Sequence, residues 1–456
     1  MARVRDPTQP PPAKSAALLN PTTIDSLGED IMLDIFLRLP SLATLIRAAL
    51  ACPAWRRAVA SSPSFRRRFR ELHPEPLLGI VAKPLRDALP TFTPAQRRDR
   101  DVLAAIRGGD FALTCLLDTD GDACDVPLRW DIWDCRDGYF VLANWDAGLL
   151  AVVNPLDRSC TQYIAMPFDT SAPPAPAAGQ DDCPAASCDM HLLCWGEDPM
   201  EFRFVWLILE KSRVQATIYT SNTGHWNFLP WVDVAERAPP HDADMSWLCS
   251  GTQAGGFLYW PFKNQKHVLK LDTATMEFSV SELPPVLENF KFVIGETKGG
   301  EPCIVYGTGL SICVLMRNLD DGGAEKWVLA STVKYNPESD PPANHGRLRV
   351  VAIRDGFVYL VTSEMFLSLC LETMKLEKLF PRSFRAHKLY PYIMAWPASL
   401  VGNFGSFAVT QDCDRNSPCK ASNNALVSKW YKEDRVPFIF DKIGAYFEVR
   451  EMHSDV

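Results

Sequence analysis

The sequence contains no apolar run long enough to cross a membrane. A spanning helix needs about 20 mostly apolar residues, whereas the most apolar stretch, residues 202–209, is short and contains Arg203. The first residues, MARVRDPTQPPPAKSAA, lack the apolar core of a secretory signal. The N-x-S/T triplet at residues 20–22 has proline in the middle and cannot accept a glycan. We therefore predict no membrane partner and a location in the cytoplasm, the nucleus or both.

The chain also lacks a surplus of positive charge. It has 47 Lys and Arg against 55 Asp and Glu, a net charge of −8. Because nucleic-acid binding depends on positive side chains that neutralise phosphates, the sequence predicts no nucleic-acid partner. A composition of 47% hydrophobic and 22% charged residues is ordinary for a soluble protein. Since 456 residues exceed what one hydrophobic core supports, we expect two or three structural units.

No disulfide framework or standard metal motif is present. The 14 cysteines are scattered, which indicates free thiols in a reducing compartment. Cys183, Cys188, His191 and Cys194 do cluster, but their spacing, C-x4-C-x2-H-x2-C, fits no common zinc site. His191 and Cys194 are three residues apart in an alternating run, so they face opposite sides of a strand. We predict no metal and no cofactor.

Recognisable catalytic motifs are missing as well. The segment DTDGDACD at 118–125 imitates a calcium loop, yet Ala123 and Arg129 occupy the positions that need glycine and glutamate. Neither a phosphate-binding G-x-x-x-x-G-K-[ST] loop nor a G-x-S-x-G elbow occurs. The sequence therefore predicts no catalytic residue. An enzyme remains an alternative, because the members of a catalytic triad need not be close in sequence.

Residues 24–73 have apolar positions at helical spacing. Pro40 ends a first helix, Ser41 can cap a second, and Pro53 precedes a third. We expect three short helices, whose apolar positions are Ile31, Met32, Ile35, Phe36 and Leu39, then Leu42, Leu45, Ile46, Ala49 and Leu50, then Trp55 and Val59. A unit this small buries only about 60% of its unfolded surface, yet it carries more apolar positions than one inward stripe per helix requires. The surplus predicts a surface that a partner covers.

The order and spacing of these residues resemble an F-box. The resemblance rests on LGEDIMLDIFLRLP at 27–40, on Leu45, Arg47, Cys52 and Trp55, and on SSPSF at 61–65. One departure is Gly28, where the motif usually has proline. The resemblance implies a Skp-type adaptor as partner and, through it, a cullin and a RING subunit. The positions that it implies face or support the adaptor are Leu27, Ile31, Ile35, Leu39, Pro40, Leu45, Ala49, Cys52 and Trp55.

Two other interpretations of this region stay open. The helices could be only a cap on a larger domain. The arginine-rich run RRRFR at 66–70 could be a nuclear-localisation or nucleic-acid patch. We favour a solvated helix face for the arginines, because they alternate with Phe65 and Phe69 on a short helix.

From about residue 77 the sequence changes to short strands separated by glycine turns. Five segments repeat one plan, with turns at residues 137–138, 196–198, 255–256, 299–300 and 355–356. The strands after three of the turns are near copies, GYFVL, GFLYW and GFVYL, and the segments end on IAMP, NFLP, SELP, WVLA and KLFP. Repeats of about four strands every 50 residues or so predict β-propeller blades.

Further strand-like residues lie at both ends of this region: LLGIV at 77–81, FALTCLL at 111–117 and LYPYIMAW at 389–396. Because a propeller must close its ring to avoid open edges, we expect a composite sixth blade; seven blades and a pair of β-sandwiches are alternatives. The phrases WDIWDCRDGYFVL and LLAVVNPLDRSCTQYIAMP resemble the kelch-like, F-box-associated propellers of plant proteins.

The predicted fold is therefore an α+β multidomain chain, a three-helix F-box followed by an all-β propeller. We expect a disordered leader at 1–22, the F-box at 23–73, the propeller at 77–400 and a partly ordered tail at 401–456. The resemblance implies a non-catalytic substrate receptor of an SCF-type ubiquitin ligase, whose propeller recruits a target protein. The sequence names neither the target nor the residues that contact it. The alternative is an interaction scaffold that binds the adaptor without an active cullin ligase.

Overall fold

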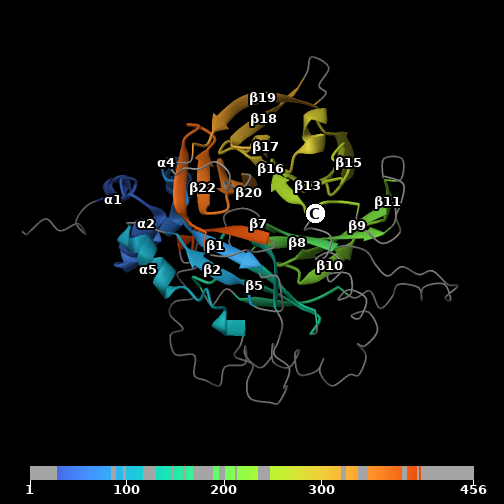
Figure 1. The fold of residues 1–456 in the computed structure, drawn as a ribbon. Helices are drawn as coiled ribbons and strands as arrows, with labels where there is room; N and C mark the ends of the chain where they lie inside the picture. The colour runs from blue at the N-terminus through green and yellow to red at the C-terminus, as the bar shows by residue number, and fades with distance from the viewer. Residues whose placement is uncertain are drawn as a thin grey trace, which may run out of the picture.

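The computed structural model describes residues 28–83, 89–95, 99–116, 130–145, 147–157, 161–167, 188–194, 201–210, 213–234, 247–319, 325–336, 348–382, 388–397 and 400–401. Six small β-sheets stand around a common axis, and short helices lie at one side of them (Figure 1). This is the predicted architecture, a six-bladed β-propeller preceded by helices. The predicted leader, and the predicted tail beyond residue 401, lie outside the described residues.

Four helices precede the propeller, where the sequence predicted three. They are α1 (Glu29–Phe36), α2 (Leu42–Leu50), α3 (Pro53–Ser61) and α4 (Pro63–Leu72). The fourth arises because the side chain of Ser62 accepts a hydrogen bond from the Phe65 backbone N–H and proline follows at the first helical position. The arginine-rich run at 66–70, for which we expected a solvated helix face, lies on this fourth helix. Trp55 of α3 lies edge-on to Phe36 of α1, with ring centroids 5.7 Å apart, and so joins the third helix to the first.

Five antiparallel sheets, built from consecutive strands, form blades I to V. Blades I and II come first: blade I is β3 (Asp131–Arg136), β4 (Tyr139–Asn144), β5 (Leu149–Val153) and β6 (Gln162–Ala165), and blade II is β7 (Cys188–Cys194), β8 (Phe202–Glu210), β9 (Arg213–Thr220) and β10 (His225–Phe228), with β11 (Val232–Asp233) beside β9. Blade III is β12 (Thr252–Ala254), β13 (Phe257–Pro261), β14 (His267–Asp272) and β15 (Phe278–Glu282), and blade IV is β16 (Phe292–Glu296), β17 (Pro302–Thr308), β18 (Ser311–Leu319) and β19 (Glu325–Lys334). Blade V is β20 (Arg349–Arg354), β21 (Phe357–Val361), β22 (Met365–Cys370) and β23 (Leu376–Pro381).

Blade VI is composite, as predicted, and closes the ring. It consists of β2 (Thr91–Pro94), β1 (Leu77–Lys83) and β24 (Lys388–Ile393), so strands from both ends of the propeller sequence share one sheet. The strand predicted at 111–117 is wrong. That segment contains a short 3-10 helix, Thr114–Leu116, and the second N-terminal strand of the blade is β2 instead.

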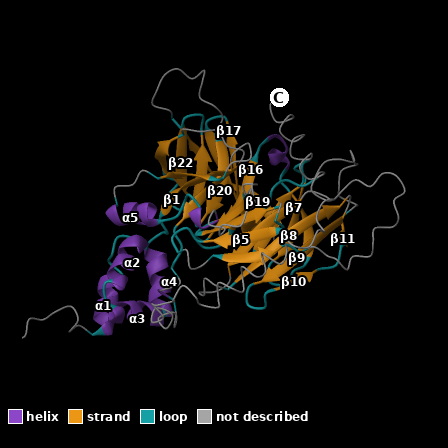
Figure 2. Cartoon of the chain, turned by 90° about the horizontal axis from the view of Figure 1, so that it is seen from below, coloured by secondary structure: helices purple, strands orange, loops and turns teal. Residues whose placement is uncertain are grey.

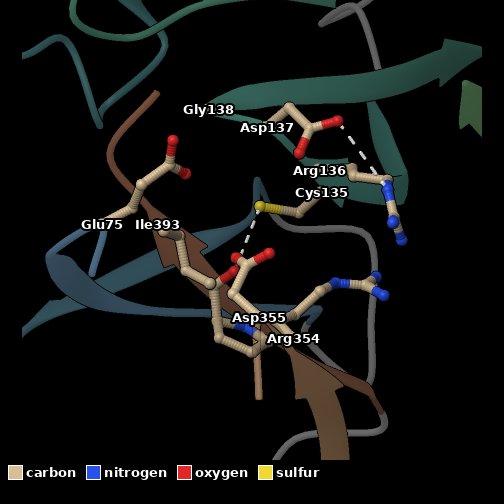
Figure 3. Close-up of a pocket in the computed structure, with 9 residues that line it drawn as sticks. Glu75, Cys135, Arg136, Asp137, Gly138, Arg354, Asp355 and Ile393 are labelled. Atoms are coloured by element: carbon tan, nitrogen blue, oxygen red, sulfur yellow. Dashed lines mark hydrogen bonds and ion pairs between the residues drawn. The ribbon is translucent and has the colours of Figure 1, made fainter. Parts of the chain in front are cut away.

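Asp-Gly turns join the first two strands of blades I and V. The backbone φ is +48° at Asp137 and +75° at Gly138, and +48° at Asp355 and +76° at Gly356. Positive φ at both central residues belongs to the type I′ turn, whose twist matches that of the flanking strands. Both turns lie at the same end of the propeller and line one pocket (Figure 3). The turn predicted at 196–198 lies outside the described residues.

Tyr392 of β24 fixes the closing strand against the first blade. Its ring is fully buried and lies 5.0 Å from Phe111 and 5.1 Å from Phe140 by ring centroids. Its hydroxyl donates a 3.0 Å hydrogen bond to the carbonyl oxygen of Gly138. Tyr390 likewise donates to the carbonyl oxygen of Trp133, at 3.0 Å. The closure therefore depends on side chains of β24 as well as on its ladder with β1.

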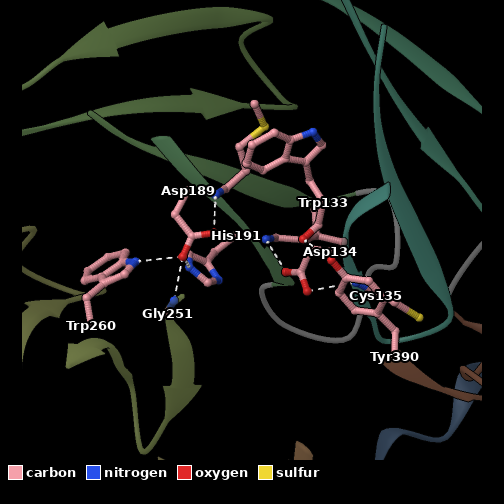
Figure 4. A network of polar contacts seen from close by, with 10 residues as sticks. Trp133, Asp134, Cys135, Asp189, His191, Gly251, Trp260 and Tyr390 are labelled. Atoms are coloured by element: carbon pink, nitrogen blue, oxygen red, sulfur yellow. Dashed lines mark hydrogen bonds and ion pairs between the residues drawn. The ribbon is translucent and has the colours of Figure 1, made fainter. Parts of the chain in front are cut away.

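Buried carboxylates connect the inner strands of blades I, II and III (Figure 4). Asp134 of β3 accepts a 3.0 Å hydrogen bond from the backbone N–H of Leu192 on β7. Asp189 of β7 accepts from the backbone N–H of Gly251 at 2.6 Å and from the indole N–H of Trp260 at 3.1 Å. The His191 Nε2 atom lies 3.2 Å from the same carboxylate. Burial raises the pKa of Asp189, but His191 and the donated hydrogen bonds outweigh it and hold that pKa below its usual range.

The helices share a hydrophobic core with blades VI and I. Phe69 of α4 lies 5.9 Å from Trp396 by ring centroids, and the Arg70 guanidinium lies over the same indole. The Lys298 ammonium of blade IV donates a 2.6 Å hydrogen bond to the carbonyl oxygen of Glu71. These contacts fix how the helices sit on the propeller (Figure 2).

A fifth helix, α5 (Arg100–Gly108), comes from the propeller part of the chain and packs against α2. The Ser41 hydroxyl, which caps α2, donates a 3.0 Å hydrogen bond to Asp99, which caps α5. Arg47 also pairs with Asp101 at 2.6 Å. One side of α2 is therefore occupied by the protein itself. Among the described helices none is long and apolar enough to span a bilayer.

Replacing Tyr392 with alanine should lower the free energy of unfolding by about 3–5 kcal/mol, because it removes a fully buried ring at the closing strand. Tyr392→Phe, which keeps the ring and loses one hydrogen bond, should lower it by about 1 kcal/mol. Chemical denaturation measures both values. Tyr163, an exposed residue of blade I, is the matched control; an equal loss in Tyr163→Ala would contradict the special role of Tyr392.

Asp189→Asn should destabilise the propeller by roughly 3 kcal/mol at pH 7, because the amide cannot replace a carboxylate that accepts several buried hydrogen bonds. A carboxyl group whose pKa is depressed by folding stabilises above its unfolded pKa of 3.8 and loses that stabilisation as the pH falls further. The difference in free energy of unfolding between Asp189→Asn and the wild type should thus become smaller below about pH 4. Thermal denaturation from pH 3 to 8 tests this, with the exposed Asp233→Asn as control. A stability difference between Asp189→Asn and the wild type that does not change with pH would disprove that ionised Asp189 stabilises the propeller.

Candidate functional site

Helix α1 is apolar on two faces. Met32 and Phe36 are buried in the core, while Ile31 and Ile35 on the neighbouring face, about 100° around the helix, are 55% and 38% exposed. Leu50 at the end of α2 is 52% exposed. We call Ile31, Ile35, Leu50, the exposed Pro40 and the half-buried Leu39 the apolar helix surface. Large apolar side chains that the fold leaves in water, on a helix that already fills the core, are typical of a protein-binding surface.

The structure separates the predicted adaptor-binding residues into three groups. Ile31, Ile35 and Pro40 are exposed; Leu39, Cys52 and Trp55 are half-buried; and Leu45 and Ala49 are fully buried. Leu27 lies outside the described residues. Leu45 and Ala49 can therefore support the surface but cannot contact a partner, and the binding role of the others stays a prediction.

The sequence grouped Leu50 with Leu45, Ala49 and the other apolar positions of the second helix, but the structure buries Leu45 and Ala49 and leaves Leu50 exposed. The residue is exposed at the last position of α2, where the helix has turned away from the core. The arginine-rich run also departs from expectation at one position. Arg66 is buried, and its guanidinium donates to the carbonyl oxygens of Val59 and Ala60 at the end of α3. Arg67 and Arg68 lie on the solvated face, as predicted.

A polar pocket lies at the end of the propeller that carries the Asp-Gly turns of blades I and V, and Figure 3 shows the side chains that line it. It is formed by the linker between α4 and β1, by the turns of blades I and V, and by β24; its lining residues are Glu75, Cys135, Arg136, Asp137, Gly138, Arg354, Asp355, Pro391 and Ile393. The tripeptide Arg-Asp-Gly occurs at both turns, at residues 136–138 and 354–356. Sequence reasoning used the turns only as evidence for blades, and this repeated tripeptide is the signal that could have revealed the pocket.

The two arginines of the pocket lie in a crowded charged environment. Arg136 Nη2 is 3.4 Å from Glu296 Oε1 and Arg136 Nε is 3.8 Å from Asp137 Oδ2. Arg136 Nη1 is buried and has no hydrogen-bond partner among the described residues. Burial and the neighbouring Arg136 lower the pKa of Arg354, so the two guanidinium groups repel each other.

The acidic groups of the pocket also repel one another. Burial, followed by the charges of Asp355 and Asp137, raises the pKa of Glu75 to about 8. Burial and Asp137 raise the pKa of Asp355 as well. At neutral pH Glu75 is therefore mostly protonated.

The thiol of the pocket is not activated as a nucleophile. Burial raises the pKa of the Cys135 thiol well above its ordinary value, and this thiol donates to the carbonyl oxygen of Pro391. A neutral thiol is a poor nucleophile. The described residues contain no group of three side chains placed to hold a metal ion. In the cluster of Cys183, Cys188, His191 and Cys194, Cys183 lies outside the described residues and His191 faces Asp189. The predicted acidic turn at 118–125 also lies outside the described residues.

Glu75→Gln should stabilise the protein at alkaline pH. An acid whose pKa is raised from 4.5 to about 8 by folding loses folding stability as the pH rises through that interval. The variant cannot ionise, so we expect it to exceed the wild type by about 1–2 kcal/mol at pH 9 and by less at pH 5. Thermal denaturation at the two pH values measures the difference, with the exposed Glu288→Gln as control. If the stability of Glu75→Gln relative to the wild type does not increase between pH 5 and pH 9, the raised pKa of Glu75 is refuted.

Solved structures with a related shape are distant. The extracellular domain of the putative one-component system BT4673 from B. thetaiotaomicron is 11% identical, with a TM-score of 0.28, and the match covers 55% of this chain and 28% of that one. Apo AztD from Citrobacter koseri is 11% identical, with a TM-score of 0.27, and the match covers 56% of this chain and 73% of that one. A functionally unknown protein from Desulfotomaculum acetoxidans is 13% identical, with a TM-score of 0.29, and the match covers 61% of this chain and 75% of that one. This chain thus spans just over a quarter of the first of these proteins.

TM-scores this low give no information about function. No curated protein matches the chain. One protein family does match, the one described as "F-box protein AT5G49610-like, beta-propeller", over residues 131–400. The matched segment runs from β3 to the end of the propeller and makes up more than half of the 456 residues. The chain therefore belongs to the F-box protein AT5G49610-like β-propeller family.

Proposed function

We propose that the chain is the substrate-receptor subunit of an SCF-type ubiquitin ligase. Helices α1–α4 bind a Skp-type adaptor, which connects the chain to a cullin and a RING subunit. The propeller recruits a target protein for ubiquitination. Membership of an F-box protein family supports this assignment, as does the F-box-like order of residues in the helices.

The observation that carries the proposal is the exposure of Ile31 and Ile35. Both lie on a different face of α1 from the buried Met32 and Phe36 and are partly exposed to water, so they are not part of the hydrophobic core of the described residues. Burying apolar surface yields about 25 cal/mol per Å², and an adaptor that covers these two side chains gains that free energy. Among the described residues α5 packs on α2, and Ile31 and Ile35 of α1 stay exposed.

The role in the reaction is proximity. A receptor that holds its target beside a ubiquitin-charged enzyme raises the effective concentration of target lysines without providing a nucleophile or a base. The contacts of Phe69 with Trp396 and of Lys298 with Glu71 support this role, because they hold the helices and the propeller in a fixed relation. A target bound to the propeller is then presented at a defined distance from the adaptor.

Co-purification from plant cells tests the assembly. Tagged full-length chain should recover the adaptor and a cullin together, from the cytoplasm or the nucleus. Recovery of the adaptor without a cullin would instead favour the non-degradative scaffold. The described part of the chain contains eight free cysteines, which supports either of these reducing compartments.

Ile35→Asp should abolish adaptor binding. An unpaired carboxylate buried in an apolar contact costs several kcal/mol, whereas in the free protein the exposed aspartate costs little. Pull-down with purified Skp-type adaptor measures the loss, and an unchanged melting temperature shows that the fold survives. The control is Leu72→Asp on α4, because Leu72 is 56% exposed but lies outside the apolar helix surface. Full binding by Ile35→Asp, or equal loss in both variants, would rule out the assigned surface.

A further inference from the structure

The polar pocket beside the Asp-Gly turns of blades I and V is not explained by adaptor binding. It is lined by the linker around Glu75 and by the Arg-Asp-Gly turns of blades I and V, not by α1 or α2. Its residues also do more than join strands, because they bring together carboxyl groups that form no ion pair and an arginine nitrogen that has no hydrogen-bond partner among the described residues. The pocket therefore has the features of a binding site.

One side of the pocket is acidic and open. Asp137 and Asp355 stand at the tips of the two turns, where part of each residue reaches solvent although surrounding groups desolvate the Asp355 carboxyl, and Glu75 comes from the linker (Figure 3). Among the described residues neither Glu75 nor Asp355 forms an ion pair with a basic side chain. Burial first, and then the charge of Asp137, raises the pKa of both carboxyl groups, although Arg70 acts against this at Glu75 and Arg136 and Arg354 act against it at Asp355. A further positive charge beside these carboxyl groups would favour their ionised forms.

The other side of the pocket carries an unsatisfied donor. The Arg136 side chain is only 10% exposed, yet its Nη1 atom has no hydrogen-bond partner in the described part of the chain. A buried guanidinium nitrogen without an acceptor is unfavourable. The ligand that completes this pocket therefore combines a cation with a hydrogen-bond acceptor.

We propose that the pocket binds a lysine or arginine side chain of a target polypeptide. The cationic head lies among Glu75, Asp137 and Asp355, and a carbonyl oxygen of the same peptide accepts a hydrogen bond from Arg136. The inference rests on the proposed function in one respect, namely that the peptide belongs to the protein that the propeller recruits.

Charge and spacing favour this ligand over a metal ion or an anion. The described residues place no three acidic, histidine or cysteine side chains close enough to share a metal ion, whereas an ammonium or guanidinium group can span more widely spaced carboxylates. Asp134, Asp137, Asp355 and Glu296 act on the two arginines, so negative charge exceeds positive charge around the pocket. The net charge of −8 also draws basic segments toward the protein.

Calorimetry with a defined peptide tests the proposal. The probe is acetyl-Gly-Gly-Lys-Gly-Gly-amide, titrated into the full chain at pH 7. The control peptide has norleucine in place of lysine, which keeps the aliphatic chain and removes the ammonium group. We expect the lysine peptide to bind at least about tenfold more tightly. Because the bound cation favours ionised Glu75, binding should also release a proton, seen as a heat that differs between phosphate and Tris buffers.

Two variants complete the test. Asp355→Asn keeps the turn, since asparagine tolerates a φ of +48°, and it should weaken binding of the lysine peptide about tenfold. The exposed Glu288→Gln, outside the pocket, should bind as the wild type does. Equal affinity for the lysine and norleucine peptides, or unchanged binding by Asp355→Asn, would overturn the proposal.

Adaptor pull-down separates this outcome from the proposed function. Asp355→Asn leaves the apolar helix surface intact, so it should retain adaptor binding. A chain that captures the adaptor but does not distinguish the two peptides refutes only the pocket. A chain that binds the lysine peptide but captures no adaptor refutes the receptor role, and the pocket remains a site for basic peptides.

Discussion

The pairing of β1 with β24 is the interaction on which the rest of the structure depends. It joins residues more than 300 positions apart into blade VI and leaves no open gap in the ring. Tyr392 and Tyr390 extend this pairing to blade I through buried rings and hydroxyl groups. Without it, blades I and V would each present an unprotected side, and the two Arg-Asp-Gly turns would not face a common pocket.

The same closure positions the helices. Because β1 follows α4 after a short linker, the strand that completes the ring also brings Phe69 and Arg70 to Trp396. The helices gain from the propeller the buried surface that a unit of their size lacks. Their surplus apolar residues on α1 can then stay in water, because they are not needed for stability. An exposed apolar surface and a stable fold are thus compatible in a small helical unit.

Much of the fold could be predicted from local patterns. Asp-Gly turns, repeated apolar strands and leftover strand segments at both ends indicated six blades with one composite, because strand pairing follows short-range chemistry. The fourth helix was not counted among the three, although Phe65, Phe69 and the arginines between them suggested a helix face, because Ser62-Pro63 can either end a turn or begin a helix. Residues 111–116 were mistaken for a strand, since a short apolar run has no decisive period. The pocket depends on groups such as Glu75, Arg136 and Asp355, which only the closed ring brings together, and no local pattern shows that.

The position of β24 in the sequence has a consequence for biosynthesis. β1 is among the first parts of the propeller to leave the ribosome, but its partner emerges only after residue 388 has been translated. Throughout that interval the nascent chain carries an unpaired edge, a strand that chaperones must shield from neighbouring polypeptides. A product that stops before β24 could not anchor its helices on Trp396 either. Only a chain translated beyond that point can therefore hold helices α1–α4 in place on the propeller.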